Sequence, residues 1–155
     1  MIRRAEKKDI PRIMKLLQEV AAVHHEARPD LFLPGKTKYT VPELEGILMD
    51  PKTPVFVYAD GMDVVQGYAF CILEYHSESH VLTPIRTLYI DDLCVEEAAR
   101  EKKIGSRLFD YVKNYAREQG CYNLTLNVWE GNDSAKAFYL GRGMQVQKTG
   151  MEVIL

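Results

Sequence analysis

The sequence lacks the features that mark several classes of protein. None of its apolar runs approaches the roughly 20 residues that a membrane-spanning helix needs, and residues 1–11 alternate charges where a signal peptide has an apolar core. The formal net charge is only −2, whereas nucleic-acid-binding domains are usually strongly basic. There are no internal repeats or low-complexity tracts. We therefore expect a cytoplasmic protein that binds neither a membrane nor nucleic acid.

Cysteine is scarce as well. Cys71, Cys94 and Cys121 are an odd number at wide spacing, with no CxxC pair and no matching histidines. A disulfide framework usually has an even number of cysteines, and a structural zinc site has closely spaced ligands. The sequence therefore favours reduced, buried cysteines and predicts that no metal is required.

What the sequence does contain is the composition of a soluble globular domain. Of its 155 residues, 46% are apolar and 27% are charged, which is close to the usual averages. This length fits one domain over residues 1–155 and is sufficient to bury a core.

Apolar spacing predicts strands alternating with helices. A helix is expected after Asp9 as its cap, followed by three more at 42–50, 104–120 and 135–141, the last with Asn132, Asp133 and Ser134 as candidates for its N-cap. The expected strands cover 2–5, 54–60, 64–76, 86–95 and 121–129, with one or two closing strands in 144–155. This order indicates an α/β or α+β domain with a mixed sheet.

The strand RTLYIDDLCV (86–95) contains two adjacent acids, which is unusual inside a strand. Side chains alternate between the two faces of a sheet. Alternation predicts that Asp92 shares a face with Leu88 and Ile90, and that Asp91 lies on the opposite face.

The segment REKKIGSR (100–107) contains four cations close to Gly105 and lies between this strand and the next predicted helix. Unpaired amides at the start of a helix bind phosphate, and glycine allows a ligand to approach the backbone closely. Arg100, Lys102, Lys103 and Arg107 can add charge. The segment alone fits either an anion site or a solvated basic turn.

Residues 85–144 as a whole resemble the GNAT superfamily of acetyl-CoA-dependent N-acetyltransferases. The family signature joins a strand, an Arg/Gln-x-x-Gly-x-Gly/Ala loop, a helix, a further strand and an Asn-x-x-Ala-x-x-Phe-Tyr helix. Arg100 and Gly105 match the loop, and the second helix is matched by Asn132, Ala135, Phe138 and Tyr139. The resemblance implies a mostly antiparallel mixed sheet of about six or seven strands with about four helices.

The loop departs from the family pattern at two positions. Lys103 stands where the family usually has the first glycine, and Glu101 stands where another glycine often precedes it. If Lys103 must adopt a glycine-like backbone, it carries strain. If not, its amide and ammonium can still face a pyrophosphate.

The resemblance implies which residues bind coenzyme A. The pyrophosphate would lie on the amides around Gly105, the pantetheine arm would pair with the strand at Leu93 to Val95, and Asn132 would bond the cofactor near its sulfur end. The cofactor-binding residues implied in this way are Leu93, Cys94, Val95, Arg100, Glu101, Lys102, Lys103, Ile104, Gly105, Ser106, Asn132, Ala135 and Tyr139.

The resemblance also implies catalytic roles. Tyr139 would protonate the departing thiolate, and a backbone amide of the strand would polarise the thioester carbonyl. The pKa of an alkylamine lies about 3.4 units above neutral pH, so freeing its lone pair costs about 4 to 5 kcal/mol. Asp91 and Asp92 would attract the cationic acceptor and pass its proton outward. Cys94 has no adjacent base, so we expect direct attack without an acyl-enzyme.

The acceptor is less defined. YIDDLCV is similar to the corresponding strand of the diamine and polyamine (spermidine/spermine) acetyltransferases, which points to a small amine. His24, Glu26 and Phe32 lie where the family builds its acceptor pocket, and Trp129 fits either the core or a pocket wall. An acetyltransferase for protein N-termini or lysines and a non-catalytic acyl-CoA-binding module stay open. Family members commonly form dimers, so a homodimer is also an expectation.

Overall fold

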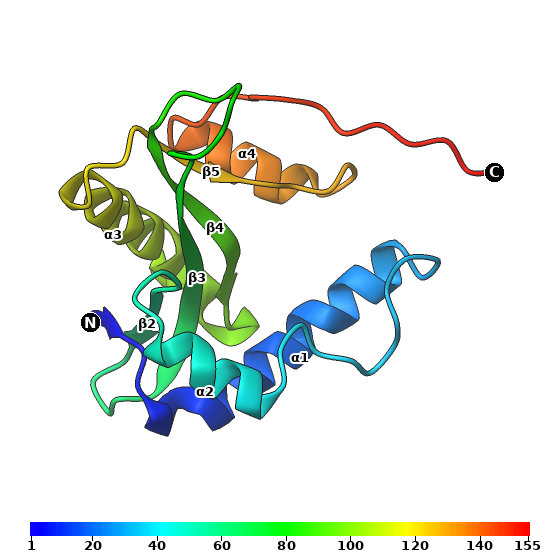
Figure 1. Cartoon of the computed structure of the whole chain (residues 1–155). Helices are drawn as coiled ribbons and strands as arrows, with labels where there is room; N and C mark the ends of the chain where they lie inside the picture. The colour runs from blue at the N-terminus through cyan, green and yellow to red at the C-terminus, as the bar shows by residue number, and fades with distance from the viewer.

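Five strands form one sheet in chain order, β1-β2-β3-β4-β5 (Figure 1). The structure is a computed structural model that describes residues 1–155 apart from the side chain of Glu101. Neighbouring strands are antiparallel except for the last pair, β4 and β5, which are parallel. The strands are β1 (Ile2–Arg4), β2 (Val55–Ala59), β3 (Val65–Tyr75), β4 (Arg86–Val95) and β5 (Asn123–Leu126).

Four α-helices cover the sheet, two on each face (Figure 1). They are α1 (Ile10–Ala27), α2 (Val41–Met49), α3 (Ile104–Glu118) and α4 (Asp133–Gly141), with short 3-10 helices η1 (Lys7–Asp9) and η2 (Glu97–Lys102). The parallel pair β4 and β5 is connected through α3, as a parallel connection requires. The predicted α/β class, the mixed sheet and the helix count are confirmed.

The two faces of the sheet bury separate apolar clusters. On one face, Ile13, Leu16 and Leu44 of α1 and α2 pack against β2 and β3. On the other face, Phe109 and Val112 of α3 pack against β3 and β4, with α4 at the margin of the cluster. Each fully buried side chain of this size contributes roughly 1.5 to 3 kcal/mol. The sheet is therefore held rigidly between the two layers of helices, and β4 lies within this rigid part of the fold.

The segment predicted to close the sheet does not do so within the chain. Residues 145–155 are extended, but throughout the described part of the chain they pair with no strand. The sheet accordingly has five strands and ends at β5. The segment runs away from α4 along the top of the molecule (Figure 1).

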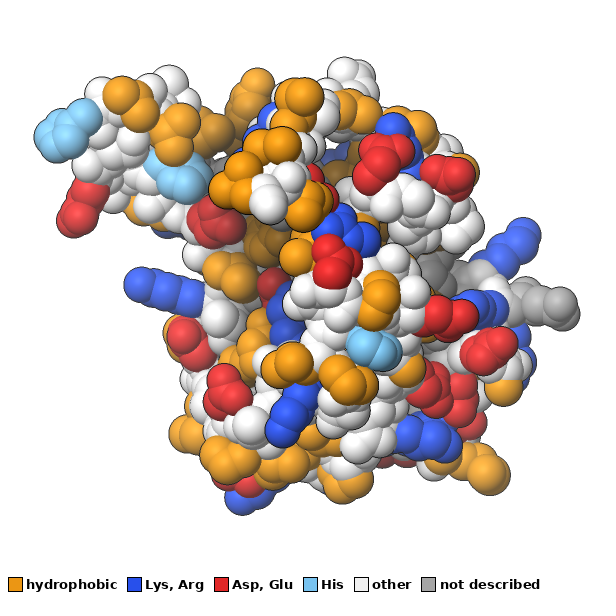
Figure 2. Space-filling view, turned by 90° about the vertical axis from the view of Figure 1, so that its right-hand side faces the viewer, with side chains coloured by type: hydrophobic (Ala, Val, Ile, Leu, Met, Phe, Trp, Pro, Cys, Tyr) orange, Lys and Arg blue, Asp and Glu red, His pale blue; other side chains and the backbone are white. Residues whose placement is uncertain are grey.

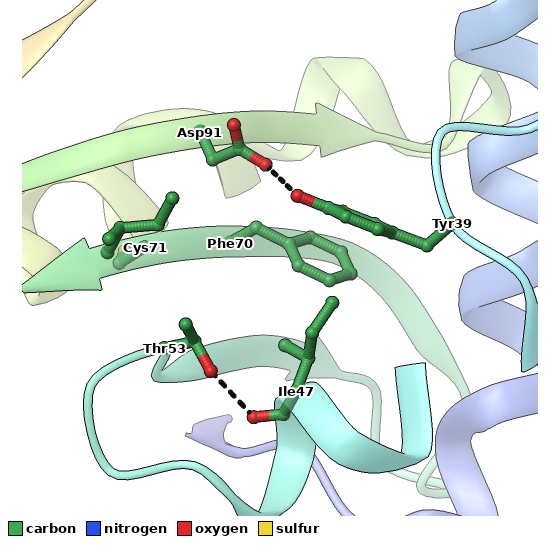
Figure 3. Close-up of a pocket in the computed structure, with 7 residues that line it drawn as sticks. Tyr39, Ile47, Thr53, Phe70, Cys71 and Asp91 are labelled. Carbon is green, nitrogen blue, oxygen red and sulfur yellow. Dashed lines mark hydrogen bonds between the residues drawn. The ribbon is translucent and has the colours of Figure 1, made fainter. Parts of the chain in front are cut away.

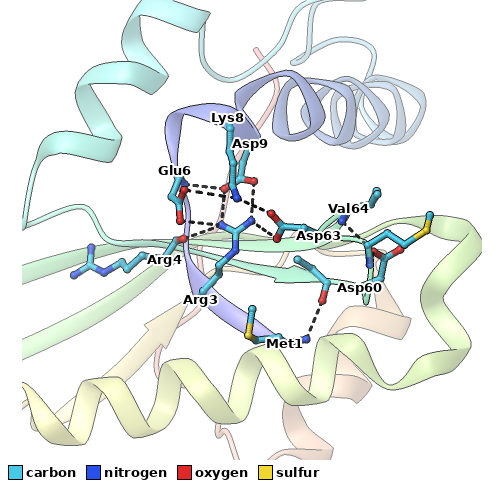
Figure 4. A network of polar contacts seen from close by, with 11 residues as sticks. Met1, Arg3, Arg4, Glu6, Lys8, Asp9, Asp60, Asp63 and Val64 are labelled. Carbon is cyan, nitrogen blue, oxygen red and sulfur yellow. Dashed lines mark hydrogen bonds and ion pairs between the residues drawn. The ribbon is translucent and has the colours of Figure 1, made fainter.

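A polar network ties β1 to the start of α1 and to the β2–β3 turn (Figure 4). The guanidinium of Arg3 donates to both carboxylate oxygens of Asp9, at 2.8 and 3.0 Å, and to Asp63 at 2.9 Å. Asp9 is the residue that precedes α1, as predicted, but its carboxylate binds Arg3 and the Glu6 amide instead of capping the helix. This network fixes the layers on the side of the sheet away from β5.

The surface carries charges of both signs, interspersed over the face seen in Figure 2. No helix in the described part of the chain is both long and apolar enough to cross a bilayer. All three cysteines are free, with Cys71 and Cys94 buried and Cys121 half-buried.

Candidate active site

An irregularity in β4 sets the geometry of the site. Phe70 of β3 pairs with Asp92, but the next residue, Cys71, pairs with Ile90, so Asp91 is an extra residue without a partner. Such a β-bulge places two successive residues on one face of the sheet. The prediction that Asp91 and Asp92 lie on opposite faces is therefore wrong. Ile90 packs with α3, whereas both acids contact groups on the α1–α2 face.

Asp91 is held by two residues of the loop before α2. The Tyr39 hydroxyl donates a hydrogen bond to Asp91 Oδ2, and the ring of Tyr39 stacks on Phe70 with 5.4 Å between ring centroids (Figure 3). Lys38 Nζ donates to Asp91 Oδ1 at 2.9 Å and to the Asp91 carbonyl oxygen at 3.2 Å. The side chain of Asp91 is 11% exposed. Its negative charge is thus matched by a lysine of the same chain.

Asp92 has a different environment. Its Oδ2 accepts a hydrogen bond of 2.7 Å from the hydroxyl of Tyr68, which is itself fully buried. Burial raises the pKa of Asp92, and the Tyr68 hydrogen bond and the charges of Lys38 and His24 offset only part of this. No ion pair to Asp92 is formed within the described chain. Asp92 is therefore the acid of the pair that lacks a bound cation.

A pocket of about 160 Å³ lies beside Asp91, between α2 and β3 (Figure 3). Its lining is mostly apolar and is made by Tyr39, Ile47, Thr53, Phe70, Cys71, Ile72 and Asp91. A carboxylate at the edge of an apolar pocket suits a ligand with a cationic end and a short hydrocarbon chain.

Beyond the bulge, β4 separates from β5. The last pair between these strands is Ile90 with Leu126, whereas Leu93 to Val95 pair only with β3. The opening between the strands therefore begins at Asp91, and the edge of β4 from there to Val95 faces it. Cys94 lies in this segment, but burial raises the pKa of its thiol to about 12. A thiol in that state is a poor nucleophile.

The start of α3 has an unusual backbone conformation at Lys103. Lys103 follows η2 with φ 57° and ψ 27°, which is the left-handed conformation that favours glycine. The first backbone bond of α3 runs from the Arg107 amide to the Lys103 carbonyl, at 3.1 Å. The amides of Ile104, Gly105 and Ser106 precede it and have no acceptor within the helix. Of the two conformations that the sequence left open for Lys103, the structure has the glycine-like one.

The side chains around these amides differ in what they can offer. Arg100, Lys102 and Lys103 are exposed, so their charges can reach a ligand. Ile104 is fully buried and can contribute only its backbone, while Ser106 is half-buried. Arg107 lies against the ring of Tyr58 and donates to its hydroxyl at 3.1 Å. The predicted role of Glu101 lies outside the described residues.

Gly105 is not required by packing within the protein. A Cβ built at Gly105 would lie 3.6 Å from Phe138 and from Val95, which is ordinary van der Waals contact. The idea that this glycine admits a ligand stays a prediction. The same contacts show that the start of α3 lies directly beside α4 and the end of β4.

The signature helix α4 begins as its residues predict. Asn132 is the N-cap, and its Oδ1 accepts from the Ala135 amide and from the Ser134 hydroxyl, each at 3.3 Å. Tyr139 lies about two helical turns further along α4, with its ring 5.9 Å from Phe109 and 5.1 Å from Phe138. Burial, with a contribution from the charge of Asp92, raises the pKa of Tyr139 to about 12. Its hydroxyl therefore keeps its proton at neutral pH.

The end of α1 meets the segment that follows β5. The rings of His24 and Phe32 lie edge to face at 5.0 Å, and Phe32 meets Trp129 in the same way at 5.5 Å. His25 Nδ1 lies 2.7 Å from the Phe32 carbonyl oxygen. Of the predicted acceptor residues, His24 and Phe32 are thus brought together with Trp129, whereas Glu26 is exposed and outside this cluster.

Three contacts of the site were not predicted from the sequence, namely those of Lys38, Tyr39 and Tyr68. Lys38 and Tyr39 lie in a loop 52 or more residues from Asp91, and no local pattern marks their pairing with it. Tyr68 could have been found from its position two residues before Phe70 in a strand beside β4. Among the residues described, no three His, Cys, Asp or Glu side chains gather to hold a metal ion.

The family model of the acetyltransferase (GNAT) family matches residues 17–144. The chain belongs to the GNAT family. This GNAT protein is 30% identical over 155 residues to the thialysine N-epsilon-acetyltransferase of Bos taurus, covering 94% of this chain and 84% of the bovine one. It is accordingly an acyltransferase, and the recognised resemblance is confirmed at the level of the family.

Solved structures share the fold of this chain. A mutant form of the BH1408 protein from Bacillus halodurans is 29% identical, with a TM-score of 0.95 over 100% of this chain and 99% of that one. The aminoglycoside N-acetyltransferase AAC(6')-Iy in complex with CoA has a TM-score of 0.73 over 100% of this chain and 98% of its own, at 13% identity, and so shares the fold.

Proposed function

We propose that this enzyme transfers an acetyl group from acetyl-CoA to the primary amine of a small cationic molecule, by direct attack. The observation that carries the proposal is the bulge of β4, which brings both acids to the same face of the sheet, with Asp91 at the edge of the pocket, at the point where the pairing of β4 with β5 ends. Family membership supports the acetyl transfer, and the pocket beside Asp91 supports a small acceptor.

The residues present fit acetyl-CoA. The free amides at the start of α3, with the exposed cations Arg100 and Lys102 beside them, suit a pyrophosphate. From Val95 to Asp91 the free edge of β4 spans roughly 13 Å, and its backbone can pair with an extended arm that carries amide groups. When bound, acetyl-CoA supplies an acyl group activated as a thioester. The protein directs that group toward Asp91 and Asp92.

The two acids attract the acceptor and take up its proton. Because Asp91 is matched by Lys38, the unpaired Asp92 is the better candidate to draw an ammonium into the site. A carboxylate also stabilises the charged amine, so we assign Asp92 to recruitment and to a relay through water. We assign protonation of the leaving thiolate to Tyr139, and its retention of the proton at neutral pH supports this role.

A small acceptor suits the way the site is walled. The cluster of His24, Phe32 and Trp129 connects the end of α1 with the segment after β5 on the acceptor side. The bovine relative carries the name of an enzyme that acetylates thialysine, which is likewise an amine. A protein lysine or N-terminus is the alternative acceptor, and the same assay tests it.

Calorimetry with coenzyme A is the first test of this function, and thiol release with added amines is the second. We expect binding that weakens with salt, and release of thiol with polyamines, diamines or lysine analogues in preference to aminoglycosides and peptides. The Arg100→Ala, Lys102→Ala double variant should bind coenzyme A more weakly by roughly a hundredfold or more, since it loses two charge-assisted bonds of about 1.5 kcal/mol or more each, and about 1.4 kcal/mol is tenfold in affinity. Arg107→Ala is the matched control, because Arg107 lies on Tyr58.

The outcomes separate the alternatives. If coenzyme A does not bind to the folded protein, the proposal is wrong. Binding without turnover on any amine would instead indicate a non-catalytic acyl-CoA-binding module, and turnover only on peptides would indicate a protein acetyltransferase.

We also propose that two copies pair by exchanging residues 145–155. This segment exposes large apolar side chains, including Met151 at 93% and Ile154 at 74%. β5 pairs only with β4 in the described chain, so its outer edge can accept a strand. A groove of about 250 Å³ beside that edge, lined by Phe109, Leu124 and Met144 among others, can receive apolar side chains of a partner's segment.

Removing residues 145–155 should convert a dimer into a monomer. The apolar side chains of the segment have no cover within the chain, so dimer stability depends on burying them in a partner. Size-exclusion chromatography with light scattering measures the change. As a control, Arg28→Ala removes the 2.8 Å ion pair to Glu152, together with the local pair to Asp30, and should leave the dimer intact. A monomeric full chain would contradict the exchange.

A further inference from the structure

Lys38 occupies the place where an acceptor amine is expected. Its Nζ donates to the Asp91 carboxylate at 2.9 Å and to the Asp91 carbonyl at 3.2 Å. Because the β4–β5 pairing ends at Ile90, that carbonyl belongs to the first residue of the opening between the strands. An amine of the chain itself therefore lies at the inner end of the path assigned above to the pantetheine arm.

Lys38 is also accessible from solvent. Its side chain is 46% exposed, against 11% for Asp91, so it approaches the acid from solvent. Its other close neighbour is the ring of Tyr39, 5.9 Å from Nζ, and it lies in the loop that joins α1 to α2. By contrast, Lys8 pairs with Asp63 in the network at the far side of the sheet. Within the described contacts, Lys38 is the lysine that reaches β4.

We propose that the enzyme acetylates its own Lys38. This inference rests on the proposed function, because it uses the same acetyl-CoA and the same opening. The Lys38 ammonium first gives a proton to the Asp91 carboxylate, which passes it to water. The neutral nitrogen then attacks the thioester carbonyl carbon. A C–N bond forms and the C–S bond breaks. The nitrogen releases its second proton, and the thiolate takes up one proton and leaves as coenzyme A. The net products are acetyl-Lys38, the free thiol and one proton.

The modification would change the acceptor site. Acetylation removes the positive charge of lysine, so Asp91 would lose the partner that now neutralises it. The site would then carry two acids without a bound cation. Self-acetylation would thereby open the site to cationic acceptors and would occur once per chain.

The test uses the full-length protein with acetyl-CoA and no added amine. Intact mass spectrometry should show the gain of one acetyl group per chain, and peptide mapping should place it on Lys38. Because Lys38 contacts Asp91 of its own chain, the rate should not depend on protein concentration. Lys38→Arg should abolish the labelling, since arginine keeps the charge but stays protonated. Lys36→Arg, two residues away and exposed, is the matched control and should label normally.

Enzymatic transfer must also be separated from spontaneous acetylation by the thioester. Tyr139→Phe should slow labelling of Lys38 by the same factor as it slows amine turnover, roughly 10²-fold. Labelling spread over exposed lysines at the rate of the denatured protein would overturn the inference. So would an unmodified Lys38 in a preparation that releases thiol with an added amine, and that result would leave the proposed function standing. Failure to bind coenzyme A at all would instead overturn the proposed function.

Discussion

Replacing Tyr139 with phenylalanine should lower kcat by roughly 10²-fold or more while leaving coenzyme A affinity nearly unchanged. The substitution removes one hydroxyl and keeps the ring that packs on Phe109 and Phe138. Because burial raises the pKa of this phenol to about 12, the group is a proton donor throughout the working pH range. Steady-state kinetics and calorimetry with coenzyme A measure the two effects separately.

Tyr115→Phe is the matched control for this variant. Tyr115 packs against the same apolar cluster, but its hydroxyl accepts from Arg4 at 3.3 Å, on the side of the sheet away from β5. We expect its kcat to stay near that of the unmodified enzyme, and both variants to have similar melting temperatures. Equal activity of Tyr139→Phe would remove Tyr139 as the acid.

The parts of the site that depend on local sequence were predictable. Asn132 caps α4 because an amide side chain before a helix binds the free amides of its first turn. The positive φ of Lys103 is one of the two conformations that the family pattern left open at this glycine position. Both features are decided by residues within a few positions along the chain, so motif spacing suffices to find them.

The relation between the two acids was not predictable, because it depends on a neighbouring strand. A period of two assigns Asp91 and Asp92 to opposite faces, and only the register with Phe70 and Cys71 shows the extra residue. A one-residue change in register moves a side chain to the other face. The bulge therefore explains why the prediction was wrong, and it is the feature that brings both acids to the same face of the sheet.

The strand pairing of residues 145–155 could not be predicted for a related reason. Their alternation of apolar and polar residues predicts a strand, but alternation does not identify the partner. In the structure the segment is extended and pairs with no strand of its own chain in the part described. Contacts made by loops raise the same difficulty, since Lys38 and Tyr39 reach Asp91 from more than 50 positions away.

Asp92→Asn should make the folded protein more stable at pH 7 and the enzyme less active. Burial raises the pKa of Asp92 above its ordinary 3.8, so the folded state binds the proton more tightly than the unfolded state does. Stability is consequently lost as pH rises through the folded-state pKa, by about 1.4 kcal/mol for each unit of displacement. Asparagine does not ionise, and its oxygen can still accept from Tyr68. Denaturant unfolding should show the gain at pH 7 and no gain below pH 3.8, where aspartate is protonated in both states.

The activity of Asp92→Asn should fall although its stability rises, because a neutral side chain no longer attracts an ammonium. We expect kcat/KM for a cationic amine to fall by roughly tenfold or more, equivalent to about 1.4 kcal/mol of transition-state stabilisation. Asp91→Asn provides the comparison, since it breaks the 2.9 Å pair with Lys38 and should bring no gain in stability. Loss of stability in Asp92→Asn at pH 7 together with unchanged turnover would contradict this account. A more stable but slower variant would show that the buried charge is kept for the acceptor and not for the fold.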